Sequence, residues 1–202
     1  MKRKSSPALG SEVTSEAEDF ERRALRNGVT VVRVGGPEDV ANAIASRVKG
    51  VELVAVESNL AWLEALLGER GLRMRRPEEL DPEELLRRSG FAAVRLAAAA
   101  LHDTGGVVLI GSARAQLVTT LSDHLFVLLE RGLLERRAEI GELVRRAAEE
   151  GLGPVYIVSG PSSTRDIEHV LVRGATGPRS VTYLIGDGGD GAGRAGERGP
   201  QG

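Results

Sequence analysis

The chain has 202 residues, of which 41% are hydrophobic and 28% are charged, and its formal net charge is −2. This balance is typical of one soluble globular domain, and so small a charge excludes a global attraction to nucleic acid or to an anionic membrane. Aromatic residues are only 3% and cysteine is absent, which disfavours base-stacking surfaces and excludes disulfides, cysteine nucleophiles and thiolate-bound iron–sulfur clusters in this chain.

Both ends of the chain are predicted to be disordered. Residues 1–11 are polar and without periodicity, and residues 187–202 are rich in glycine, so neither segment buries enough apolar surface to offset its ordering entropy. No apolar run follows the basic start as in a secretory signal, and none approaches the roughly 18–20 residues that span a bilayer. We therefore expect a soluble, cytoplasmic protein with a single α/β domain over residues 12–186.

Between these ends, short apolar strands alternate with helices. In chain order, the expected helices cover residues 12–26, 37–48, 60–67, 82–88, 115–121, 135–149 and 164–173. The expected strands cover residues 29–34, 51–56, 107–110, 124–129, 155–158 and 181–185. Residues 91–101 are apolar and rich in alanine, and periodicity alone cannot separate strand from helix there. The alternation predicts a layered, mainly parallel sheet flanked by helices, in which ligands bind beyond the carboxyl ends of the strands.

The most informative segment, residues 159–168, reads SGPSSTRDIE and joins a predicted strand to a predicted helix. Ser163 and Asp166 have the spacing of a capping box, so a purely structural interpretation explains most of the residue choices. In the functional interpretation, hydroxyls and amides at the helix start bind a small anion. Pro161 removes one donor, and Asp166 and Glu168 add negative charge. Both interpretations remain open from the residues alone.

Two further segments are rich in glycine. Asp103-Thr104-Gly105-Gly106 precedes an apolar strand, where the glycines permit a tight turn or a close approach of the backbone to another group. It matches neither a Walker loop nor a dinucleotide-binding G-x-G-x-x-G pattern, so a turn into a core strand is the simpler interpretation. Residues 174–178, GATGP, are typical of a helix end followed by a turn.

The remaining candidates for chemistry are isolated residues. Glu57 follows a predicted strand, where a carboxylate nucleophile or base would lie, although a solvated loop carboxylate is the simpler interpretation. His102, His124 and His169 lack the spacing of metal ligands, and we predict no metal site.

Taken together, Asp103-Thr104-Gly105, GPSSTRDIE at 160–168 and GATGP at 174–178 resemble the motifs of the LUD-domain (lactate utilisation protein C) family, in their order and separation. The resemblance implies a fold similar to the superfamily of sugar-phosphate isomerases, glucosamine-phosphate deaminases and coenzyme A transferases. The ligand-binding residues that it implies are Thr104, Gly105, Gly160, Pro161, Ser162, Thr164, Asp166, Glu168, Thr176 and Gly177. Thr176 stands where the family has histidine, so any acid, base or ligand role of that imidazole is altered here.

The resemblance implies that the chain is an accessory or ligand-binding subunit of an L-lactate oxidation system. Its partners would be iron–sulfur subunits, which agrees with the lack of cysteine, and its ligand a small anion; the resemblance identifies no cofactor. One alternative is a stand-alone enzyme of the same superfamily that acts on a phosphorylated sugar or an acyl-coenzyme A. That enzyme would need a catalytic carboxylate, and the candidates are Glu57, Asp103, Asp166 and Glu168. A second alternative is a structural or regulatory module.

Overall fold

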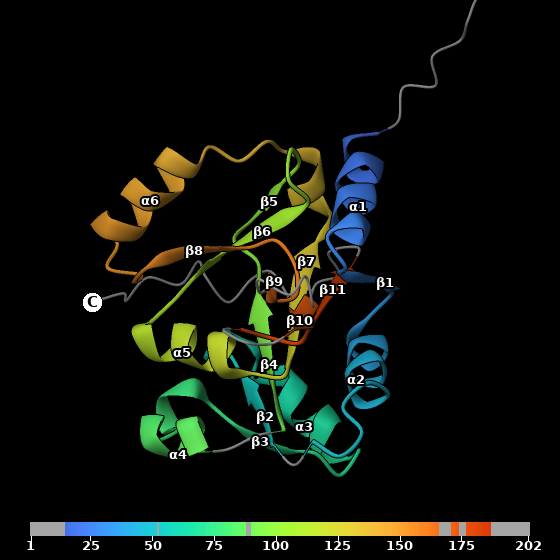
Figure 1. The fold of residues 1–202 in the computed structure, drawn as a ribbon, viewed down its shortest axis with the longest axis vertical. Helices are drawn as coiled ribbons and strands as arrows, with labels where there is room; N and C mark the ends of the chain where they lie inside the picture. The colour runs from blue at the N-terminus through green and yellow to red at the C-terminus, as the bar shows by residue number, and fades with distance from the viewer. Residues whose placement is uncertain (1–14, 52, 88–89, 166–170, 174–176, 187–202) are drawn as a thin grey trace, which may run out of the picture.

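Six parallel strands form the central sheet of the computed structural model, which describes residues 15–51, 53–87, 90–165, 171–173 and 177–186 (Figure 1). Their order across the sheet is β1-β11-β7-β4-β2-β3. The bounds are β1 Thr30–Val34, β2 Leu53–Val56, β3 Arg73–Arg75, β4 Phe91–Leu96, β7 His124–Glu130 and β11 Ser180–Gly186. The predicted α/β class with a mainly parallel sheet is confirmed. The predicted disordered ends, 1–11 and 187–202, lie outside the described residues.

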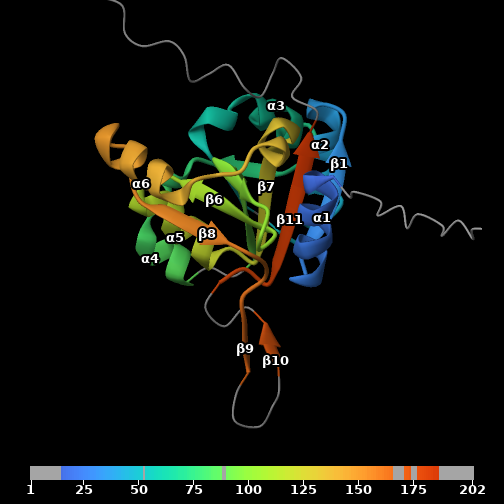
Figure 2. The same ribbon diagram turned by 90° about the horizontal axis from the view of Figure 1, so that it is seen from above.

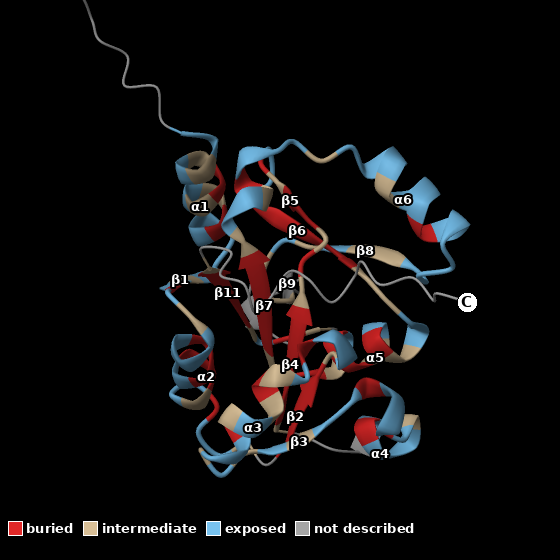
Figure 3. Ribbon diagram, turned by 180° about the vertical axis from the view of Figure 1, so that it is seen from behind, coloured by how far each residue is buried: buried red, intermediate tan, exposed pale blue. Residues whose placement is uncertain are grey.

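Helices cover both faces of this sheet (Figure 3). Successive side chains of a strand point to opposite faces, and here the side chains on both faces are mostly apolar. Val54 and Val56 pack under α2 (Pro37–Ala45) and α3 (Trp62–Gly68). Leu53 and Ala55 face the opposite layer, which contains the remaining longer helices. These are α1 Glu16–Arg26, α4 Pro82–Arg87 and α5 Ala113–Leu121, with α6 Ile140–Glu149 farther out. Short 3-10 turns lie at η1 Ser58–Leu60, η2 Pro77–Glu79 and η3 Arg131–Glu135.

The start of α1 illustrates how the sequence determines a boundary. Ser15 Oγ accepts the amide of Glu18 at 3.3 Å, and the Glu18 carboxylate accepts the amide of Ser15 at 3.1 Å. This capping box satisfies two amides that have no partner within the helix. Phe20 and Ala24, one helical turn apart, are then fully buried against the sheet. α1 is thereby held along the outer face of β1 and β11.

A second, antiparallel sheet of three strands was not expected from the sequence. It consists of β5 Ala99–Leu101, β6 Gly106–Ile110 and β8 Val155–Val158, in the order β5-β6-β8. The alanine-rich stretch left open above therefore continues from the central strand β4 into a short strand of this smaller sheet. Residues 107–110 and 155–158 were expected in the parallel sheet, and they pair with each other instead.

The helix predicted over residues 164–173 is wrong. Ser163–Arg165 forms β9 and Leu171–Arg173 forms β10, and the two pair antiparallel with Leu171 opposite Arg165. Ser163 is therefore a strand residue rather than a helix N-cap, and Asp166 lies outside the described residues. Figure 2 shows this pair of strands projecting from the body on the side where β11 begins. Short segments with apolar residues at i, i+3 and i+4 are ambiguous, and here strand pairing overrides the local pattern.

Among the described residues, none of the helices combines the length and the apolar character needed to cross a bilayer.

Candidate functional site

Two of the glycine-containing segments meet beside the C-terminal end of α1. Asn27, the residue after this helix, donates from its side-chain amide to the carbonyl of Thr104 at 2.7 Å. Gly160 lies against the same residue, because a β-carbon built at position 160 would lie 2.6 Å from the carbonyl oxygen of Asn27. Pro161 packs against the neighbouring Gly28. The segments around residues 104 and 160, far apart in sequence, are thus adjacent in space.

The glycines of the Thr104 turn are required by close packing. Gly105 has φ of +69°, and a β-carbon there would lie 2.4 Å from the backbone nitrogen of Ala24 in α1. A β-carbon on Gly106 would lie 2.5 Å from Ser159 Oγ. Thr104 Oγ1 accepts the amide of Gly106 at 3.2 Å and closes the turn. The backbone thus approaches protein groups closely here, which is one of the two roles that the sequence suggested for these glycines.

The third segment joins the same region through Ser162. The Ser162 amide donates to the carbonyl of Pro178 at 2.9 Å, and Gly177 is packed against the Ser162 side chain. Thr164 lies in β9, while Asp166, Glu168 and Thr176 lie outside the described residues.

This region, defined by residues 103–106, 159–162 and 177–178, is called the motif region below. It lies at the amino ends of β1 and β11, since Gly28 precedes β1 and Pro178 precedes β11. The described part of the SGPSSTRDIE segment follows the carboxyl end of β8, and β8 belongs to the small antiparallel sheet rather than to the parallel one.

Tyr183 joins the motif region to the central sheet. This fully buried residue of β11 donates its hydroxyl to the carbonyl of Val158 at 3.0 Å and lies 3.4 Å from that of Gly105. Its ring stacks on Phe20 of α1 with the centroids 5.8 Å apart. Burial raises the pKa of the Tyr183 phenol above its ordinary value, because the charged form is poorly solvated there.

This burial predicts a loss of stability in alkali. Above about pH 10 the unfolded chain releases the Tyr183 proton while the folded chain retains it, so the free energy of unfolding falls by up to about 1.4 kcal/mol per pH unit from this group. Tyr183→Phe should remove that part of the slope, at a cost of about 1 kcal/mol at neutral pH from the lost hydrogen bond. Urea unfolding between pH 7 and pH 11 measures both effects, and an unchanged alkaline slope in the variant would contradict the assignment.

Glu57 lies elsewhere, in a polar cluster at the carboxyl ends of β2 and β4. Its carboxylate pairs with Arg95, with Oε2 3.1 Å from Nε and Oε1 3.2 Å from a terminal nitrogen, and it accepts the amide of Leu96 at 2.8 Å. Arg95 is completely buried and also donates to the Tyr156 hydroxyl, to Thr119 Oγ1 at 2.9 Å and to two carbonyls. This cluster ties the main sheet to α5 and to β8.

The two candidate catalytic carboxylates that the structure describes therefore do not share one site. Glu57 is engaged with Arg95, whereas Asp103 is exposed in the turn beside α1, with a carboxylate oxygen 3.9 Å from a guanidinium nitrogen of Arg137. Asp166 and Glu168 lie outside the described residues. Two histidines serve local contacts: His102 Nε2 lies 2.7 Å from the Leu134 carbonyl and His124 Nδ1 lies 2.6 Å from Ser180 Oγ.

Within the described ranges, histidine, aspartate and glutamate side chains form no group of three that could hold a metal ion.

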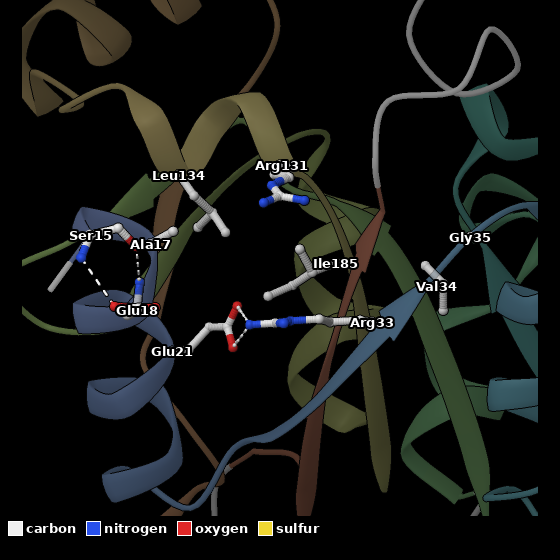
Figure 4. Close-up of a pocket in the computed structure, with 10 residues that line it drawn as sticks. All are labelled: Ser15, Ala17, Glu18, Glu21, Arg33, Val34, Gly35, Arg131, Leu134 and Ile185. Carbon is white, nitrogen blue, oxygen red and sulfur yellow. Dashed lines mark hydrogen bonds and ion pairs between the residues drawn. The ribbon is translucent and has the colours of Figure 1, made fainter.

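Sequence reasoning did not identify a cleft of about 340 Å³ at the carboxyl ends of β1 and β11. Its charged residues come from three different elements, α1, β1 and η3, and they include Glu21, Arg33 and Arg131 (Figure 4). One part of the cleft was recognisable in the sequence. Gly35-Gly36-Pro37 forms the turn between β1 and the helix that follows it, and Gly35 lines the cleft. Nothing in the sequence indicated that α1 forms the opposite wall of the cleft, because Glu18 and Glu21 resemble ordinary surface residues of a helix.

These features define an α/β protein with a parallel sheet covered on both faces and a small antiparallel sheet beside it. The LUD domain family matches residues 17–185, and the chain belongs to this family, as its motifs predicted. It is 31% identical over 171 residues to Lactate utilization protein C of Deinococcus radiodurans, covering 82% of this chain and 77% of that protein.

Two further comparisons agree with this assignment. The chain is 39% identical over 90 residues to Uncharacterized protein YkgG of Escherichia coli, a match that covers 42% of this chain and only 39% of that protein. The crystal structure of a DUF162 family protein from Deinococcus radiodurans has the same fold, with a TM-score of 0.59 and 21% identity. That likeness covers 86% of this chain and 99% of the other.

Proposed function

We propose that this chain serves L-lactate utilisation as an accessory or ligand-binding subunit that works beside iron–sulfur proteins. The observation that carries the proposal is the alignment with Lactate utilization protein C over 82% of the chain. Oxidation of a hydroxy acid releases two electrons, and this chain has no cysteine with which to hold a thiolate-bound cluster that would accept them. Partner proteins would supply that chemistry.

The geometry of the described residues favours this role over a stand-alone enzyme that acts on a phosphorylated sugar or an acyl-coenzyme A. General acid–base catalysis needs its groups within hydrogen-bond reach of the same substrate. The two described candidates lie on separate loops, and the Glu57 carboxylate is already held by Arg95 and by the Leu96 amide. The motif region packs its glycines against α1 and joins Ser162 to Pro178, which is the behaviour of a structural junction.

Growth on L-lactate tests the proposal. In the source organism, deletion of the gene should abolish or strongly slow growth on L-lactate as sole carbon source and leave growth on a sugar unchanged. Reintroduction of the wild-type gene should restore growth. Undiminished growth of the deletion strain on L-lactate would refute a role in lactate utilisation.

A second experiment tests the partners. The tagged full chain, expressed from its own locus in cells grown on L-lactate, should elute with proteins that carry iron and acid-labile sulfide. An untagged strain provides the background. If the chain elutes without iron or sulfide although its deletion blocks growth, the role in lactate utilisation holds and the partnership with iron–sulfur proteins is refuted.

A further inference from the structure

The cleft lies where the segments that follow two nearby strands, β1 and β7, pack on opposite faces of the sheet. From β1 the chain turns through Gly35-Gly36 into α2, which packs on one face. From β7 it continues into η3, whose Leu134 belongs to the core of the other face. β11 lies between these two strands. Such a divergence leaves a crevice at the carboxyl ends of the strands, and this is where open α/β sheets bind their ligands.

The walls of the cleft differ in character. Ile185 and Leu134 provide an apolar floor, and α1 closes one side with Glu18 and Glu21 (Figure 4). The volume of about 340 Å³ lies at the small end of the roughly 300–1,000 Å³ typical of small-molecule sites. A compact metabolite therefore fits better than a nucleotide cofactor.

The charged groups indicate the chemistry of the ligand. One terminal nitrogen of Arg33 lies 3.0 Å from each carboxylate oxygen of Glu21, so this guanidinium already holds a carboxylate inside the cleft. The Arg33 side chain is 75% exposed, whereas that of Glu21 is 19% exposed, so the arginine is the partner free to turn toward a ligand. Arg131 enters the same cleft from the start of η3. Planar guanidinium groups match carboxylates in geometry as well as in charge.

We propose that this cleft binds a small organic monocarboxylate, whose carboxylate lies between Arg131 and Arg33 and whose short aliphatic part lies on Leu134 and Ile185. Glu18 and Glu21 repel additional negative charge, so the site favours a monoanion over phosphates and dicarboxylates. The site is distinct from the motif region, which lies at the opposite ends of the same strands. The choice of L-lactate and pyruvate as probes rests on the proposed function.

Titration calorimetry of the purified full chain tests the site with L-lactate, pyruvate, the uncharged analogue lactamide and inorganic phosphate. The wild type should bind L-lactate or pyruvate, and bind lactamide and phosphate at least tenfold more weakly. Arg131→Gln removes charge-assisted hydrogen bonds and should weaken carboxylate binding by about 10- to 150-fold, with a smaller loss for Arg33→Gln. Arg145→Gln is the matched control, since Arg145 is an exposed arginine paired with Glu149 on the remote helix α6. The Arg145→Gln variant should bind L-lactate or pyruvate with the same affinity as the wild type.

Thermal unfolding without ligand shows that each variant is folded, so a lost affinity reports on the site. The proposal is overturned if the folded wild type binds neither L-lactate nor pyruvate, or if Arg131→Gln binds them as well as the wild type. Tighter binding of phosphate than of the carboxylates overturns the preference for a monoanion. These failures are separate from failure of the proposed function, since growth of the deletion strain on L-lactate does not depend on what the isolated chain binds.

Discussion

Glu57→Gln is expected to lower the free energy of unfolding by about 3 kcal/mol. The substitution keeps the size of the side chain and an oxygen for the Leu96 amide, but it leaves the Arg95 charge without its counter-charge. Removal of one partner of a buried ion pair costs about 3–5 kcal/mol, because the remaining charge stays desolvated. The lower end of this range applies because Glu57 is 18% exposed, so water screens part of the interaction.

Urea unfolding at neutral pH measures this loss, with a shift of the midpoint at an unchanged m-value. Glu149→Gln is the matched control, because it breaks an Arg–Glu pair of similar geometry on the exposed face of α6 and should change stability little. Equal, small effects of the two substitutions would contradict the view that the Arg95 cluster stabilises the junction between the sheets. A catalytic role for Glu57 would instead appear as lost turnover in a variant of full stability.

Gly105→Ala should destabilise the protein by about 2–4 kcal/mol. Alanine at φ of +69° is strained by roughly 1–2 kcal/mol, and its β-carbon would lie 2.4 Å from the backbone nitrogen of Ala24. Because the obstacle is the main chain of α1 rather than a flexible side chain, the helix must move. Displacement of a well-packed element costs typically a further 1–3 kcal/mol.

Gly71→Ala separates the two contributions. Gly71 has φ of +75°, and a β-carbon there meets nothing within 4 Å, so only the backbone strain remains. Its cost should be about 1 kcal/mol in the same urea titration. If both variants lose the same amount, the close approach of the Thr104 turn to α1 contributes nothing and the packing described for the motif region is incorrect.

The layered sheet was predictable because its signal is local. Strands such as β2, Leu53–Val56, are short apolar runs that are buried on both faces, and Pro37 marks the start of α2 by its own chemistry. The error at residues 164–173 has the opposite cause. β9 is a strand because it pairs with β10, and the spacing of apolar residues along the chain does not record that pairing.

The candidate site was predictable only in part. The glycines of the motif region were recognisable as positions of a tight turn or of close backbone approach, and Gly105 and Gly160 lie close to the backbone at the end of α1. The Arg95 cluster and the cleft were missed because each is assembled from residues on separate elements. Arg33 and Glu21 are twelve residues apart and meet only because α1 folds back along β1.

The position of β11 between β1 and β7 affects how the protein folds while it is being synthesised. Thr30 of β1 pairs with Thr182 and His124 of β7 pairs with Ser180, so β11 joins the edge strand to the rest of the sheet. While the chain is being synthesised, β7, β4, β2 and β3 can assemble, but β1 lacks its strand partner until residues 180–186 leave the exit tunnel. Such long-range closure is slow compared with the folding of local hairpins. During that delay the nascent chain exposes a strand edge, which makes it a natural client for a chaperone that shields unpaired strands.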